Sequence, residues 1–281
     1  MSVNVILSNR DVSICYFLWR WKLATTAAIR QHFYRDTGGG AYQRLLKLEQ
    51  AEYIRSRFDE SGKHSVWVLD RLGFDLIKND LPELRETSYL PNHWGHDLLV
   101  SAIHLGDGLF EKLSNIEFYS EQQLRAVNPE FYPDWVPKIR MHRPDGYWLV
   151  GPESNPKTIA LEVELTQKRD YDYESVGRSY FFAKVDGVIW IVPKPSLARA
   201  IHNQLIKSHG EEVKHHFVLL DPLYEKGWQA PIILGQDTGK VISEILQTCP
   251  RSSEDQLFSH VSLDTRKRAN ISSPIQLFLP N

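Results

Sequence analysis

Cysteine is scarce in this sequence, because only Cys15 and Cys249 occur among 281 residues and they lie in different regions. This scarcity excludes a disulfide framework and a cysteine-based zinc site, and it fits a reducing cytoplasm. No apolar run approaches the roughly 20 residues of a membrane span, and the N-terminus lacks the charged-then-apolar pattern of a secretion signal. Internal repeats and low-complexity tracts are also lacking. We therefore expect a cytoplasmic protein with no membrane partner.

Net charge is also small, at −2 from 33 basic and 35 acidic residues, so the total does not indicate nucleic-acid binding. The distribution is uneven, because residues 1–85 hold 13 Lys and Arg against 10 Asp and Glu, which gives +3 there and leaves −5 for the remainder. A surplus of three is common on solvated surfaces. Hydrophobic residues make up 42% of the chain. That fraction allows a buried core, and the length suits two domains of about 100 to 150 residues each.

The first part of the chain predicts three helices followed by a β-hairpin. The expected elements are helices over 10–22, 26–34 and 41–54, then strands over 55–59 and 65–70. Asn9 and Thr25 are the expected N-caps of the first two helices. In the third helix Leu45, Leu48 and Ala51 recur at helical spacing and are expected to face inward. Three helices and a hairpin in this order are typical of a winged helix-turn-helix domain.

The segment from Tyr42 to Arg55 resembles the "xxRLxxLxxxxyIxR" pattern of winged-helix DNA-binding proteins. In that family the third helix lies in the major groove. Arg and Gln suit bidentate readout of guanine and adenine, and Lys suits phosphate. The alternative is a winged helix that contacts protein and leaves the same side chains solvated. The DNA contacts that the resemblance implies are Tyr42, Gln43, Arg44 and Lys47 on the helix, and Lys63 and His64 at the wing tip.

A second motif consists of RPDGYWLV, a polar break, and TIALEVELTQK. It places Asp145 at a turn before one strand, and Glu162 and Glu164 on the next strand. Successive strand side chains point to opposite faces, so the two glutamates share a face and stand about 7 Å apart. Two alternatives are open at this point. The glutamates could lie on a solvated strand face, and Pro-Asp-Gly could be only a tight turn.

The combination of these acids also predicts a metal site. Asp145 and Glu162 are 17 positions apart and lie on neighbouring strands, so they can converge on one divalent cation such as Mg²⁺, which prefers carboxylate, phosphate and water oxygens. Three carboxylates without a cation would raise one another's pKa. A metal or a basic partner is therefore expected beside them.

This arrangement resembles the PD-(D/E)xK nuclease fold, in which Pro-Asp precedes a strand with Glu-x-Lys. The resemblance implies that Asp145 and Glu162 hold the metal and that Glu164 or Lys168 positions the attacking water. Glu164 stands where the family usually has lysine, as it does in some restriction endonucleases of this fold. Lys168 lies four positions on and would have to reach back from beyond the strand end.

Around this motif helices and strands alternate, which predicts a mixed sheet with helices packed against it. His93, His96 and Asp97 begin a helix, and since neighbouring residues point about 100° apart, helix capping is favoured over metal ligation. The other expected elements are a strand and short helix over 115–125, a hairpin over 131–150, helices over 170–184, 195–208 and 241–247, and strands over 185–193 and 215–221.

The order of these motifs is similar to that of the replication-relaxation family of bacterial mobile-element proteins, which includes MobC-like mobilisation factors. Within about residues 8–220, the segments that carry the resemblance are RLLKLEQAEYI, HDLLVSAI, RPDGYW and IALEVEL. The resemblance implies an α+β fold, with a winged helix-turn-helix followed by an α/β restriction-endonuclease-like domain with a mixed sheet. Along the chain we expect the domains 1–85 (winged helix), 86–94 (linker), 95–235 (nuclease-like) and 236–281 (C-terminal extension).

Three functions follow as hypotheses. The first is a double-stranded DNA-binding factor in plasmid replication, mobilisation or its regulation, whose nuclease-like domain is weakly active or inactive. The second is a Mg²⁺-dependent DNA endonuclease or nickase that the winged helix targets to its site. The third is a dimeric transcription repressor, since winged helices often bind half-sites in pairs. A relaxase, a replication protein and a second copy of this chain are candidate protein partners.

Overall fold

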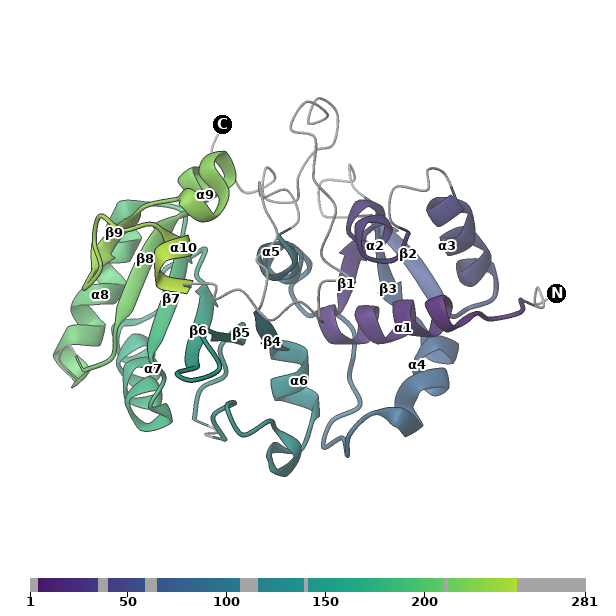
Figure 1. Ribbon diagram of the computed structural model, residues 1–281, viewed down its shortest axis with the longest axis horizontal. Coiled ribbons are helices and arrows are strands. Elements are labelled where there is room, and N and C mark those ends of the chain that lie inside the picture. The colour runs from purple at the N-terminus through teal and green to yellow at the C-terminus, as the bar shows by residue number, and fades with distance from the viewer. Residues whose placement is uncertain are drawn as a thin grey trace. The chain divides into compact units, whose positions relative to one another are not determined.

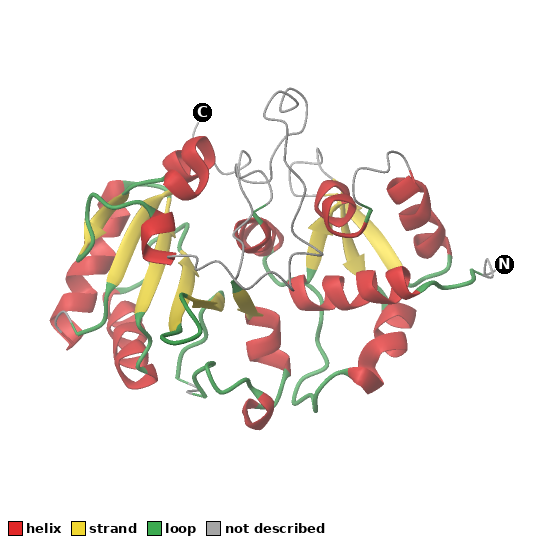
Figure 2. Cartoon of the chain, in the orientation of Figure 1, coloured by secondary structure: helices red, strands yellow, loops and turns green. Residues whose placement is uncertain are grey.

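The computed structural model describes residues 5–34, 40–58, 65–106, 116–138, 141–209 and 212–246. Over these residues the chain is α+β, with ten α-helices, a three-stranded antiparallel sheet and a six-stranded mixed sheet (Figure 1, Figure 2). This confirms the expected α+β class and the mixed sheet. The chain divides into two compact units, Met1–Ser101 with Gln122–Phe131, and Ala102–Glu121 with Tyr132–Asn281.

The first unit has the predicted order of three helices and a hairpin, with one extra short strand. Its elements are α1 (Asn9–Trp21), β1 (Leu23–Thr25), α2 (Thr26–Phe33), α3 (Gly40–Gln50), β2 (Ile54–Phe58), β3 (Ser65–Leu69), α4 (Arg71–Ile77) and a 3-10 turn, η1 (Lys78–Asp80). The strands pair antiparallel in the order β1-β3-β2. Leu45, Leu48 and Ala51 are buried, as their helical spacing predicted.

The caps of the first two helices are set by short polar contacts. The prediction of Asn9 as the first N-cap was wrong by one residue, because Ser8 has the extended backbone of a cap. The Asp11 carboxylate accepts hydrogen bonds from the Ser8 N–H and hydroxyl, each at 2.7 Å, which fixes the helix start there. The prediction for Thr25 is confirmed, since its hydroxyl accepts the Ala28 N–H at 3.0 Å.

The expected linker 86–94 lies within the first unit, and the segment just before it is paired with α6 (Glu121–Ala126) and the residue that follows. The Arg85 N–H donates to the Ala126 carbonyl at 2.8 Å, and Leu84 and Val127 form an isolated β-bridge. Pro82 and Pro91 favour an irregular chain here. They did not predict that the chain would pack against a helix some 40 residues later.

Asp97 caps the start of α5 (Trp94–Leu105), as predicted. Its Oδ2 accepts the N–H groups of Asn92 at 3.1 Å and His93 at 3.4 Å. Its Oδ1 also pairs with the buried Lys22 ammonium at 2.8 Å. Capping and a core ion pair therefore account for this acidic residue without a metal.

The second unit is built on the six-stranded sheet, in the order β4-β5-β6-β7-β8-β9. The pairs from β4 to β6 are antiparallel, those from β6 to β8 are parallel, and β9 is antiparallel to β8. Helices α7 and α8 pack side by side, and α8 contacts β7, β8 and β9 (Figure 1). The bounds of its elements are β4 (Glu117–Ser120), β5 (Gly146–Val150), β6 (Lys157–Val163), α7 (Asp170–Ala183), β7 (Gly187–Val192), α8 (Pro195–His209), β8 (His215–Leu219), α9 (Leu220–Lys226), η3 (Gly227–Gln229), β9 (Ile232–Gly235) and α10 (Ile242–Leu246). The 3-10 turn η2 (Pro129–Phe131) belongs to the first unit.

The prediction of a sheet hairpin within 131–150 was wrong. The described residues between η2 and β5 form no strand, and β5 instead pairs with β4 and β6. Pro133 and Pro137 interrupt this segment, and a proline cannot donate to a strand ladder. The Val136 N–H binds the Pro133 carbonyl at 2.9 Å, so the rival Pro-Asp at this position is a turn.

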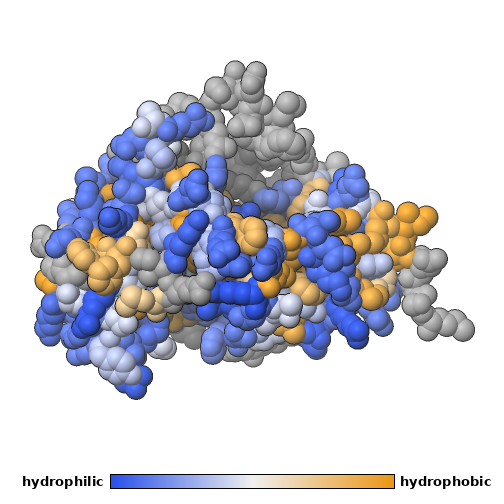
Figure 3. All heavy atoms as spheres, turned by 90° about the horizontal axis from the view of Figure 1, so that it is seen from below, coloured by the Kyte–Doolittle hydropathy of each residue, from blue (hydrophilic) through white to orange (hydrophobic). Residues whose placement is uncertain are grey.

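Figure 3 shows the distribution of polar and apolar side chains on one face of the molecule. On the face drawn in Figure 3, hydrophilic side chains predominate and hydrophobic ones occur in separate groups. No helix in the described part of the chain is long and apolar enough to cross a membrane. The exposed large hydrophobic residues that the structure describes are Ile6, Tyr42, Leu72, Phe131, Met141, Tyr171, Phe181 and Phe182.

Candidate functional site

Asp145, Glu162 and Glu164, here called the acid cluster, come together where β5 begins and β6 ends. Asp145 directly precedes β5, and its N–H donates to the Leu161 carbonyl at 3.0 Å. Its Oδ2 accepts the Val163 N–H at 2.7 Å, so the side chain is tied to the end of β6. Glu162 lies within β6, and Glu164 follows it by one residue. The three acids are thus positioned by sheet pairing.

The interpretation of the glutamates as an exposed strand face is wrong. β6 lies between β5 and β7 in the sheet, and Glu162 and Glu164 are only 6% and 5% exposed. Acids are seldom this buried without a compensating partner. Pro144 and Asp145 do stand at a bend before β5, but the Asp145 side chain also binds the next strand.

Glu162 is held by two side chains that the sequence did not indicate. The Tyr180 hydroxyl on α7 donates to Glu162 Oε1, and the His142 Nε2 lies 2.5 Å from the same oxygen. Burial, and then the negative charge of Glu162, raise the pKa of Tyr180 well above its usual range. The same two causes raise the pKa of Tyr147 on β5. Both tyrosines therefore stay protonated, and Tyr180 acts as a donor to the carboxylate.

Glu164 is paired with Lys168, which reaches back from beyond the strand end. The Lys168 Nζ lies 2.7 Å from Glu164 Oε2, although the lysine side chain is 51% exposed. The Lys168 N–H also donates to the Tyr173 hydroxyl at 2.8 Å, which fixes the loop between β6 and α7. The four positions between the two residues therefore suffice for the contact.

The pKa values of this pair are linked to the other acids. Burial raises the pKa of Glu164, Lys168 lowers it, and the charges of Glu162 and Asp145 raise it again, so it is raised overall. For Lys168, burial lowers the pKa, but the hydrogen bond to Glu164 and the charges of Glu162 and Asp145 outweigh that effect and raise it. The three acids and the lysine therefore share one electrostatic environment.

The donor set is chemically suited to a hard cation, although the acids have protein partners already. Glu162 Oε2 and Glu164 Oε1 accept no hydrogen bond from any described residue, so each keeps one oxygen for a ligand. Across the described segments, however, no group of three or more His, Cys, Asp or Glu side chains has a geometry that could hold a metal ion. As arranged here, the acids would need to shift or share the cation with water or phosphate oxygens.

A histidine and a tryptophan support the turn that carries Asp145. The Trp148 Nε1–H donates to His104 Nδ1 at 2.7 Å, so the proton of a neutral His104 is on Nε2 and points to the Asp145 carbonyl at 3.1 Å. A Cβ on Gly146 would lie 2.6 Å from the His104 ring. Glycine thus allows the close approach. Residues 104 and 148 are too far apart in sequence for a pattern to predict their contact.

The candidate DNA contacts on α3 fall into two groups. Tyr42, Gln43 and Lys47 are exposed. Arg44 is half-buried, and its Nε and Nη2 bind the two Asp11 oxygens at 2.9 and 2.6 Å. Its Nη2 also donates to the Ile6 carbonyl at 2.7 Å. Arg44 therefore joins α3 to α1. The remaining candidates, Lys63 and His64, lie outside the described residues.

Comparison with models of known protein families, with curated proteins and with solved structures found no match for this chain. The acid cluster and the exposed face of α3 therefore carry the functional inference. Each stands in a different unit, and each has a chemistry that its own side chains define.

Proposed function

We propose that this chain binds double-stranded DNA through its first unit and serves a bacterial mobile element in replication, mobilisation or its regulation. The observation that carries the proposal is the order α1, β1, α2, α3, β2, β3 with antiparallel sheet order β1-β3-β2. This order supports interpretation of the unit as a winged helix-turn-helix, whose third helix enters the major groove. The assignment to a mobile element rests on the resemblance of the four sequence motifs named above.

The exposed face of α3 supplies suitable chemistry. Gln43 can pair with adenine, Lys47 can neutralise a phosphate, and the Tyr42 ring and hydroxyl are half exposed. Arg44 has a different role in this proposal. Its ion pair with Asp11 sets the orientation of α3 on α1, so it positions the contacts and does not make them.

Electrophoretic retardation of duplex DNA tests the proposal. Lys47→Ala should weaken binding and reduce the slope of log affinity against log salt by about 0.9, the value for one phosphate contact. Lys78→Ala is a matched control, because Lys78 is exposed in the same unit and its ion-pair partner is Asp75. Replacement of Gln43 and Lys47 with no change in affinity at physiological salt would contradict the proposal. Arg44→Ala is unsuitable here, since it also breaks the pair with Asp11.

A second candidate function is a Mg²⁺-dependent DNA endonuclease or nickase, which the first unit would target. It is favoured by the meeting of Asp145, Glu162 and Glu164 with Lys168 at one end of the sheet. In this function Asp145 and Glu162 hold the metal, and Glu164 or Lys168 orients the attacking water. When bound, Mg²⁺ would stabilise the charge that develops on the phosphoryl oxygens.

Incubation of the protein with supercoiled plasmid in Mg²⁺, Mn²⁺ or EDTA separates the two candidates. Metal-dependent nicking that is lost in both Asp145→Asn and Glu162→Gln supports the endonuclease. Glutamine is preferred to alanine at position 162, because it can still accept the Tyr180 hydrogen bond. Retardation of the plasmid without nicking supports the DNA-binding factor. Nicking that survives in both variants indicates a contaminating nuclease and counts against the endonuclease.

A further inference from the structure

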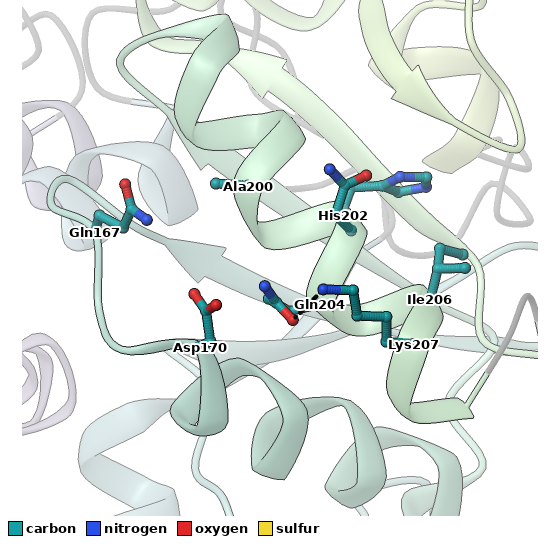
Figure 4. Close-up of a pocket in the computed structure, with 8 residues that line it drawn as sticks. Gln167, Asp170, Ala200, His202, Gln204, Ile206 and Lys207 are labelled. Atoms are coloured by element: carbon teal, nitrogen blue, oxygen red, sulfur yellow. Dashed lines mark hydrogen bonds between the residues drawn. The ribbon is translucent and has the colours of Figure 1, made fainter.

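A polar groove lies on the second unit, outside the acid cluster. Its volume is about 520 Å³, and its lining side chains include Gln167, Asp170, Asn203, Gln204 and Lys207. Figure 4 shows that it is formed by one side of α8, the loop after β6 and the start of α7. The Lys207 ammonium lies 3.4 Å from the Gln204 side-chain oxygen. We call this feature the α8 groove.

The α8 helix presents a basic and amide surface to solvent. Arg199, Asn203 and Lys207 are exposed and four positions apart, so they lie on one side of the helix. The whole helix contains no Asp or Glu, although the chain has 35 acidic residues. In this respect α8 differs from the neighbouring α7, which begins with Asp170 and Asp172.

The α8 groove adjoins the loop that carries Lys168. Gln167 and Asp170 line it, and Lys168, which lies between them in sequence, pairs with Glu164 of the acid cluster. The α8 groove and the acid cluster therefore share the loop between β6 and α7 in the second unit. A chain that lies in the groove passes next to the loop that ends at the acid cluster.

We propose that the α8 groove binds the phosphodiester backbone of DNA. The inference rests on the DNA-binding function proposed above and adds a second contact surface to it. Lys207 in the lining supplies positive charge for a phosphate, and Arg199, which is exposed on the same side of α8 but outside the lining, supplies a second charge along the helix. The amides of Asn203, Gln204 and Gln167 donate hydrogen bonds to phosphate and sugar oxygens. An open, polar, amide-lined groove suits a backbone, because contacts of these types carry no base specificity.

Asp170 is the acidic residue in this lining and works against the proposed ligand. Asp170 is exposed, so water solvates its charge and the free protein loses little stability through it. A phosphate in the groove, however, would be repelled by this charge. Removal of the Asp170 charge and removal of the Lys207 and Arg199 charges are therefore expected to change DNA affinity in opposite directions.

Salt-dependent binding of a short duplex to the full chain tests the proposal by fluorescence anisotropy. The double variant Arg199→Gln and Lys207→Gln should lower the slope of log affinity against log salt by about 1.8, for two phosphate contacts. Asp170→Asn should raise affinity. The control is Lys184→Gln with Lys226→Gln, which makes the same change of charge at two exposed sites, one just after α7 and one at the end of α9. It should leave the slope closer to that of the parent chain.

The outcomes separate this inference from the proposed function. If Lys47→Ala weakens binding while the α8 double variant and Asp170→Asn match their parent, the groove proposal is overturned and the first unit remains the DNA-binding site. If the α8 variants act as expected while Lys47→Ala has no effect, the groove stands and the α3 site fails. A parent chain that does not bind the duplex at low salt overturns both.

Discussion

The Tyr180 hydroxyl on α7 donates a hydrogen bond to the Glu162 carboxylate on β6, and both side chains are buried. The His142 Nε2 contacts the same Glu162 oxygen from the chain before β5. The buried Glu162 is therefore compensated by two hydrogen-bond donors, His142 before it in the sequence and Tyr180 after it. This contact joins a helix, a strand and the segment that leads to Asp145, so it stabilises the geometry on which any chemistry of the acid cluster depends.

Removal of the Tyr180 hydroxyl tests the importance of this contact. Tyr180→Phe preserves the ring but leaves the buried Glu162 with one donor fewer, and the free energy of unfolding should fall by about 1 to 3 kcal/mol. Urea denaturation measures the loss. Tyr171→Phe on the same helix is the control, because Tyr171 is 55% exposed and its change should stay within about 0.5 kcal/mol. Equal stability of the two variants would show that the hydrogen bond has little net value.

Gly146 offers a second test at the same site. A Cβ there would lie 2.6 and 2.7 Å from two atoms of the His104 ring and 3.0 Å from the Tyr119 carbonyl oxygen. The ring cannot move away freely, because Trp148 and the Asp145 carbonyl hold it on both sides. Gly146→Ala should therefore lower the free energy of unfolding by roughly 1 to 3 kcal/mol, as overpacking does.

Gly40→Ala is the control for this experiment, since nothing lies within 4 Å of the added carbon at that helix start. It should be neutral or stabilising by up to about 1 kcal/mol. If both glycine variants unfold at the same urea concentration as the parent, His104 is not a fixed support for the turn.

The local features of the fold were predictable from periodicity and turn residues. Leu45 and Leu48 at helical spacing marked the buried side of α3, and the alternation in TIALEVEL marked β6. Short elements were missed, because β1 has three residues and β9 four, too few for a periodic pattern. The predicted strand over 215–221 also ran past the end of β8 into α9, since Leu219 and Leu220 suit either structure.

The candidate site was only partly predictable for a related reason. Asp145, Glu162, Glu164 and Lys168 are close in sequence, so one motif identifies them. His142, Tyr180 and His104 reach the cluster through sheet pairing and helix packing, which a single sequence does not specify. Arg44 illustrates the same limit, because its spacing placed it on the outer side of α3 but its partner Asp11 lies 33 positions earlier.

Arg44 and Lys47 should therefore differ in their effect on stability. Arg44→Ala leaves Asp11 buried without its cation and should cost roughly 2 to 3 kcal/mol, somewhat below the loss of about 3 to 5 for fully buried pairs, because the arginine side chain is 27% exposed. Lys47→Ala, on an exposed position of the same helix, should cost less than about 0.5 kcal/mol. Urea denaturation of both variants measures the difference.

The cost of Arg44→Ala should also depend on pH. Burial acts to raise the pKa of Asp11, but hydrogen bonds from Arg44 and Ser8 outweigh it, so the pKa lies below its ordinary value of 3.8. A carboxyl whose folded pKa is depressed stabilises the fold above 3.8 and loses that contribution as pH falls through the folded value. The difference between parent and Arg44→Ala should therefore shrink in acid, and a constant difference would contradict this account.

Burial of His216 should cause a separate loss of folding free energy at mildly acidic pH. It lies on β8 and is 2% exposed, and burial lowers its pKa from 6.5 to about 4. Asp237, whose Oδ2 lies 3.6 Å from His216 Nδ1, opposes this effect, whereas the charges of Lys214 and Lys240 add to it. In the folded chain the imidazole is therefore neutral over a range in which the unfolded chain is protonated.

The direction of the pH dependence follows from proton uptake on unfolding. Between pH 6.5 and about 4 the unfolded chain binds more protons at His216, so the free energy of unfolding decreases as pH falls through this window. At 1.36 kcal/mol per pKa unit, the full loss is on the order of 3 kcal/mol. His216→Gln should flatten this part of the profile in urea denaturation at several pH values. His93→Gln changes an exposed histidine and should not alter it. If the profile keeps its slope in His216→Gln, other groups account for the acid sensitivity, and His216 is not buried in its neutral form.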